Sequence, residues 1–209
     1  YYYMVTFWYS LAPWSLLIFG VLLLSIIKGS IKTDLERFFL TTIAVIFMML
    51  SLVSSKIQIY LAPAFPFMIY LTALLLQKFK WNRWLAITVA LPAFLFSISI
   101  FVLLYFIFAE KNQVINQPFI VLGVAALSIF AWNSLYFLYK KKDLYRSVNV
   151  LAIGILITLF TASWALPQVN SYIGYKNLSD EIIKVRAEKQ ISATYFYKLK
   201  RADNMDVFL

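Results

Sequence analysis

The chain has 209 residues, of which 63% are hydrophobic, 19% are aromatic and 13% are charged, and its formal net charge is +10. Soluble domains are about half apolar and about a quarter charged, so this composition indicates an integral membrane protein. The absence of cysteine and histidine excludes disulfides, thiol chemistry and zinc sites built on those residues. Much of the positive charge lies in short connectors between apolar runs, where it would meet anionic membrane lipids, and we expect no nucleic-acid partner.

The opening segment, residues 1–9, contains four tyrosines, a phenylalanine and a tryptophan, which is too aromatic for the lipid core of a membrane span. Such a segment is typical of an interfacial aromatic belt, and the alternative is the lip of a substrate cavity. Pro13 and Trp14 then lead into the uncharged run Ser15–Ile27. Because the sequence begins with tyrosine inside this aromatic patch, we expect the chain to be a piece of a longer protein.

The hydrophobic runs along residues 1–167 predict six transmembrane helices. Pro63 and Pro66 should kink or loosen the start of the third, and Pro167 should close the sixth. Asn133 and Ser134, in the fifth, should face other helices. The predicted spans cover about residues 8–27, 38–53, 59–76, 84–109, 119–139 and 148–166.

The connectors predict the orientation of these spans. Those after spans one, three and five contain three, three and four Lys or Arg residues, whereas those after spans two and four contain one each. Cytoplasmic loops carry the excess of Lys and Arg, so spans one, three and five should end in the cytoplasm. The aromatic N-terminal segment, the loop with Lys56 and the C-terminal tail should then lie on the other side.

A short polar segment with one lysine, residues 54–58, separates the second and third spans. Ser55 and Gln58 have the spacing of a helix capping box, which places Lys56 in a first helical turn and Tyr60 on the same face. A cation beside the positive end of a helix dipole indicates a nearby anion such as a phosphate. The alternative is that Lys56 only extends to lipid headgroups at the end of a span.

The composition changes after Pro167, and residues 168–209 read as the start of a soluble domain. Ser179–Glu181 has the pattern of a helix start, and Ile191–Leu199 has the composition of a strand. The predicted fold is therefore an all-α polytopic membrane protein of about six transmembrane helices, followed by the start of a small α/β extracytoplasmic domain. About forty residues are too few to fold alone, so we expect this domain to be truncated.

The residues do not make up a complete active site. The nine acidic residues lie in the predicted connectors and tail, and we identify no metal site and no cofactor. The spans lack the midplane charges expected of a transporter and the polar stripe expected of a channel. An aromatic entrance, a lysine and a soluble tail on one side of a multi-span scaffold suit an enzyme that acts on a lipid-linked phosphate.

Three stretches resemble bacterial membrane glycosyltransferases of the GT-C class related to the lipid A aminoarabinose transferase and the protein O-mannosyltransferases. The first is the aromatic segment running into a Pro-Trp-Ser helix start, and the second is a serine–lysine, tyrosine, leucine, proline signature. The third looks like the opening of that family's periplasmic domain. These stretches are Tyr9–Leu17, Ser54–Pro63, and Ile173–Tyr175 together with Lys200–Val207.

The resemblance implies transfer of a sugar from a polyprenyl-phosphate donor to a lipid A-like or protein acceptor, outside the cytoplasmic membrane of a bacterium. It implies a catalytic carboxylate upstream of Tyr1, so the chain alone should be inactive, and it leaves a divalent metal in the full-length protein open. Lys56, supported by Tyr60, would contact the lipid phosphate. The cavity lip would hold Tyr1, Tyr2, Tyr3 and Trp8. The alternatives are a flippase or ligase of polyprenyl-linked envelope glycans, and half of a transporter.

Overall fold

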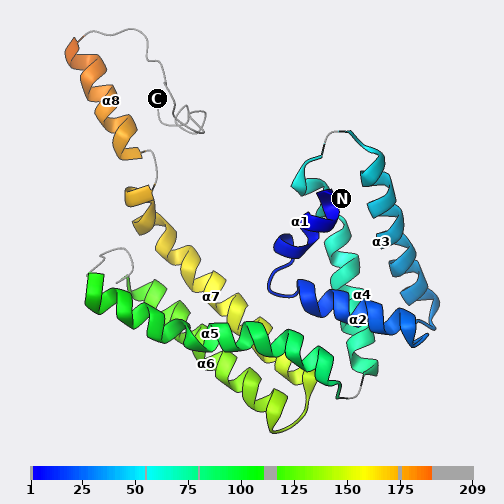
Figure 1. Cartoon of the computed structure of the whole chain (residues 1–209). Coiled ribbons are helices and arrows are strands. Elements are labelled where there is room, and N and C mark those ends of the chain that lie inside the picture. Colours follow the sequence, from blue (N-terminus) through cyan, green and yellow to red (C-terminus); the bar gives the residue numbers. More distant parts are fainter. Residues whose placement is uncertain (1, 55, 80, 111–116, 174–175, 190–209) are drawn as a thin grey trace. The chain divides into compact units, whose positions relative to one another are not determined.

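The computed structural model describes residues 2–54, 56–79, 81–110, 117–173 and 176–189, and every regular element in them is a helix (Figure 1). The all-α prediction is confirmed for this part of the chain, and the predicted strand Ile191–Leu199 lies outside it. The elements are α1 (Tyr2–Ser10), α2 (Ser15–Ile27), α3 (Asp34–Leu52), the 3-10 helix η1 (Gln58–Leu61), α4 (Ala64–Lys78), α5 (Arg83–Glu110), α6 (Pro118–Tyr139), α7 (Leu144–Ile173) and α8 (Lys176–Lys189).

Four of the described helices contain segments long and apolar enough to cross a membrane: Asp34–Leu52, Arg83–Phe108, Pro118–Tyr139 and Leu144–Pro167. Helices α1 and α2 pass the same test together, but they meet at an angle of 117° and so make a broken span or a re-entrant loop. Helix α4 is apolar but has only 15 residues. The described residues therefore contain four or five candidate spans, which indicate a membrane protein.

The segments predicted as the first and third spans are not continuous helices. Each of them is broken once, and a proline lies at each break. Pro13 falls in the turn between α1 and α2. Pro63 is the N-cap of α4, so the predicted loosening near Pro63 is confirmed as a break between η1 and α4. Proline is tolerated at a helix start, because the first N–H groups of a helix have no partner inside the helix.

Three local predictions are corrected by the structure. Pro167 lies inside α7, which continues to Ile173, and so it does not end the helix. Helix α8 begins at Lys176, three residues before the predicted start at Ser179. Asn133 is exposed and donates to Ile129 O of its own helix (3.0 Å), so it does not face another helix.

The chain divides into two compact units, Tyr1–Ser99 with Leu127–Ile155, and Ile100–Ala126 with Leu156–Leu209. The first unit holds a large apolar core to which α2, α4 and α5 contribute the fully or almost fully buried Val21, Leu71, Leu75, Leu85 and Val89.

Small hydroxyl side chains join the later helices of the first unit. Ser128 of α6 donates to the backbone oxygen of Ser97 in α5 at 2.8 Å. The hydroxyl groups of Ser134 in α6 and Ser147 in α7 lie 2.8 Å apart, and both side chains are fully buried. The prediction that Ser134 faces another helix is confirmed. Such bonds are typical of helix packing in membranes, where small residues let two backbones approach.

In the second unit, a hydroxyl side chain likewise bonds to the backbone of a neighbouring helix. Thr158 of α7 donates to the backbone oxygen of Gly123 in α6 at 3.1 Å. A Cβ atom at Gly123 would lie 2.6 Å from the Thr161 hydroxyl oxygen, so the glycine permits this close approach. The rings of Phe119 and Trp164 also lie close together, tilted by 32° and with centroids 6.3 Å apart.

Candidate functional site

The segment with Lys56 is an extended connection between two helices. Helix α3 ends at Leu52, and its C-cap Val53 has extended backbone angles, as does Ile57. The helix that follows, η1, has Ile57 as its N-cap and no capping side-chain hydrogen bond. The predicted capping box is therefore wrong, although Ser55 itself lies outside the described residues. Lys56 precedes the helix, so it lies neither in a first helical turn nor on one helix face with Tyr60.

One side chain anchors this segment to the core. Leu61, at the end of η1, is completely buried, whereas Lys56, Ile59 and Tyr60 are exposed. Backbone hydrogen bonds between residues three apart complete the turn, with Tyr60 N–H donating to Ile57 O (3.2 Å). The ammonium of Lys56 makes no ion pair among the described residues, so it is accessible to an external anion.

Helix α1 packs against η1 and α3, so the structure brings the aromatic N-terminal segment and the Lys56 segment together. Tyr3 is buried in the core that also holds Leu61, Tyr2 is partly buried, and Trp8 is exposed. Tyr1 lies outside the described residues. Of the predicted lip residues, Trp8 is therefore open to a ligand, and Tyr3 is a packing residue.

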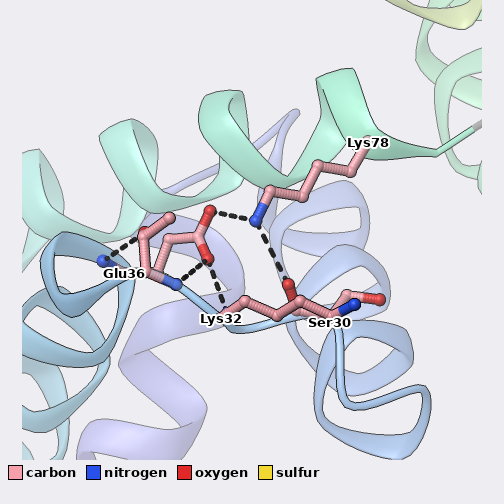
Figure 2. Close-up of polar contacts among 5 residues, drawn as sticks. Ser30, Lys32, Glu36 and Lys78 are labelled. Atoms are coloured by element: carbon pink, nitrogen blue, oxygen red, sulfur yellow. Dashed lines mark hydrogen bonds and ion pairs between the residues drawn. The ribbon is translucent and has the colours of Figure 1, made fainter.

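At the start of α3 lies a polar cluster that the sequence reading missed (Figure 2). Thr33 and Glu36 form the capping box of α3, with Thr33 Oγ1 accepting from the Glu36 N–H at 3.3 Å. The Glu36 carboxylate accepts backbone N–H groups of Lys32 (2.9 Å) and Thr33 (3.2 Å), and it pairs with the Lys78 ammonium. Lys78 also donates to Ser30 O at 3.2 Å. The Thr-x-x-Glu spacing is the sequence signal for this cap, although its position in a basic connector hides it among other polar residues.

The ion pair between Glu36 and Lys78 holds together the connector before α3 and the connector after α4. Lys28, at the end of α2, also lies over the ring of Phe79 at 5.4 Å from its centroid. A surface hollow lined by Arg83, Tyr139 and Lys142 places the connector between α6 and α7 beside the start of α5. All three basic connectors thus lie at one end of the first unit, called here the basic end, in agreement with their predicted common side.

At the C-terminal end of α3, near Lys56, the first unit has no carboxylate. The acidic residues of that unit are Asp34, Glu36 and Asp143, and all three lie in or beside the basic connectors. Among the described residues no group of acidic side chains could hold a metal ion. The first unit therefore offers a cation and aromatic side chains at the Lys56 end, but no general base.

An apolar cavity of about 280 Å³ lies within the first unit, separate from Lys56. The turn between α1 and α2 forms part of its wall with Leu11 and Trp14, α4 contributes Thr72, and α7 contributes Tyr145. The Thr72 hydroxyl already donates to Met68 O (2.7 Å), so this cavity is suited to a hydrocarbon group and not to acid–base chemistry.

No protein-family model matches the sequence, and comparisons with curated proteins and with solved structures likewise found no match.

Proposed function

We propose that this chain is part of a membrane glycosyltransferase that moves a sugar from a polyprenyl-phosphate donor to a lipid A-like or protein acceptor on the non-cytoplasmic face of a bacterial inner membrane. One observation carries the proposal. The aromatic helix α1 packs against the turn that follows Lys56, at the end of α3 away from the basic end. An exposed cation that has no ion pair in the described part of the chain, beside exposed aromatic rings, suits a lipid-linked phosphate.

In the proposed reaction, the acceptor oxygen forms a bond to the anomeric carbon of the sugar, and the bond from that carbon to the donor phosphate oxygen breaks. Polyprenyl phosphate leaves with the bonding electron pair, and the acceptor proton passes to a general base. Lys56 stabilises the departing phosphate, and Tyr60 and Trp8 border the site. The first unit places no carboxylate at this end, and the base in this proposal is the carboxylate that the resemblance to the GT-C class implies upstream of Tyr1.

The proposed topology has six crossings. Helices α1 and α2 make the first, and η1 with α4 makes the third, despite the breaks at Pro13 and Pro63. Residues 168–209 then begin an extracytoplasmic α/β domain. This arrangement puts the three basic connectors in the cytoplasm, as the distribution of Lys and Arg predicts.

The test is sugar transfer by the full-length protein in membranes supplied with a radiolabelled polyprenyl-phosphate sugar. Appearance of the label in extracted lipid A or in protein would support the proposal. Label that only crosses the bilayer on its carrier would replace transfer with the flippase alternative. Label that stays on the carrier and on its original side would reject both.

A further inference from the structure

We propose that the groove between α5 and α6 is a binding site for an anionic phospholipid of the leaflet that faces the basic end. This inference depends on the first unit alone and is independent of the proposed glycosyl transfer. It combines an apolar groove made of two adjoining hollows, two cations at one end that make no ion pair within the described residues, and a groove length that matches one leaflet.

The groove consists of two adjoining hollows on the surface of the first unit. One, of about 360 Å³, includes Arg83 and Lys142 in its lining, and the other, of about 530 Å³, is lined entirely by apolar and aromatic side chains. Ile87 and Tyr139 line both hollows, so the two adjoin. The apolar part is formed by Ile87, Ala90, Leu91, Phe94, Trp132, Leu135 and Tyr139.

The two cations at the polar end are available to a ligand. Neither Arg83 nor Lys142 makes an ion pair with any carboxylate in the described part of the chain. The nearest acid in sequence, Asp143, is already occupied, because its two oxygens accept from Arg146 Nε (3.2 Å) and from the Arg146 backbone N–H (3.0 Å). Two unpaired cations at the mouth of an apolar groove complement a lipid phosphate.

The start of α5 adds to this positive end. The side chain of Asn82 accepts the Trp84 N–H at 2.9 Å, and its backbone oxygen accepts the Ala86 N–H, also at 2.9 Å. Asn82 therefore caps α5 at Arg83, where the positive end of the helix dipole reinforces the side-chain charges. Trp81 lines the same hollow and provides an aromatic ring of the kind found at headgroup level.

The length of the groove favours a phospholipid over a polyprenyl phosphate. Phe94 follows Arg83 by eleven residues, which is about 16 Å along a helix. One leaflet occupies about half of the 30 Å hydrocarbon core, so the groove accommodates the depth of a single acyl chain. A polyprenyl chain is much longer than this groove.

The experiment uses quenching of Trp132, which lines the apolar part of the groove, by lipids with brominated acyl chains. The chain is reconstituted with its other five tryptophans changed to phenylalanine, which keeps an aromatic ring at position 81 of the site, and brominated phosphatidylglycerol is compared with brominated phosphatidylcholine. We expect phosphatidylglycerol to bind about tenfold more tightly, because each basic side chain near an anionic lipid contributes about fivefold and the two effects overlap. The double variant Arg83→Gln/Lys142→Asn should remove this preference. Asn is chosen because Lys142 has a φ of 50°, which Asn tolerates.

Lys141→Gln is the matched control, since Lys141 lies in the same connector but does not line the groove, and it should keep the preference. Equal quenching by both lipids, or a preference that survives the double variant, would overturn the proposal. Unbrominated polyprenyl phosphate that displaces the quencher better than phosphatidylglycerol would overturn the choice of ligand. If the single-tryptophan chain fails to fold, native mass spectrometry of the unaltered chain and the double variant, with both lipids, gives the same comparison.

Discussion

A lysine lies near each end of α3, and the two lysines differ in their surroundings. At the start of the helix, Lys78 pairs with the buried Glu36, which also accepts two backbone N–H groups. At the other end, about 28 Å away along a 19-residue helix, Lys56 is exposed, and the segment is anchored by the apolar side chain of Leu61. Lys78 therefore stabilises the contact between α3 and α4, whereas Lys56, which makes no ion pair among the residues that the structure describes, remains available to a ligand.

The largest effect on stability should come from the apolar anchor at the Lys56 end. Leu61→Ala should lower the free energy of unfolding by about 3 kcal/mol, because it leaves a cavity around a completely buried position. Thermal unfolding in detergent micelles would measure this. Ile59→Ala is the control, since Ile59 is 72% exposed, and it should have little effect. Equal losses in the two variants would mean that Leu61 is not the anchor.

A substitution at the basic end should cause a smaller loss of unfolding free energy. Glu36→Gln should cost about 2 kcal/mol, because it removes the charge that pairs with Lys78 and weakens the bonds to two backbone N–H groups. The loss stays moderate because Lys78 is partly exposed and can turn toward water. Asp34→Asn, at an exposed position in the same helical turn, should leave the unfolding temperature unchanged. An unaltered unfolding temperature in Glu36→Gln would show that the pair does not stabilise the bundle.

Removing the helix cap alone should lower the free energy of unfolding by a still smaller amount. Thr33→Ala removes the side-chain oxygen that accepts the Glu36 N–H and should cost about 1 kcal/mol. Thr41→Ala, at an exposed position within α3, serves as the matched control. A cost in Thr33→Ala no greater than in this control would argue against the cap as a separate contribution.

The long uncharged runs allowed the bounds of two of the later helices, α5 and α6, to be predicted closely, whereas α7 extends beyond its predicted span at both ends. The span expected at 119–139 corresponds to α6 at Pro118–Tyr139, and the one at 84–109 to α5 at Arg83–Glu110. Hydrophobicity alone did not reveal the 117° bend beside Pro13 or the break before α4, because the neighbouring elements that pack around a proline decide whether a helix bends or stops there.

The candidate site was predictable in part. The sequence placed the aromatic segment and Lys56 on the same side, and the packing of α1 against η1 agrees with that. Ser55 and Gln58 have the spacing of a capping box, but the helix at this place, η1, has Ile57 as its N-cap. Thr33 and Glu36 have the same spacing and do form a capping box, at the start of α3. The pairing of Glu36 with Lys78 joins residues far apart in the sequence, so no local pattern could have revealed it.

The most direct test of the central claim, that Lys56 contacts the donor phosphate, compares Lys56→Ala with Lys56→Arg in the full-length protein. The measurement is the concentration of polyprenyl-phosphate sugar that gives half-maximal transfer in membranes. Loss of a charge-assisted contact should raise this concentration about tenfold in Lys56→Ala, Lys56→Arg should largely restore it, and the unfolding temperature should stay unchanged in both. A half-maximal concentration that is the same in Lys56→Ala as in the unaltered protein would contradict the account.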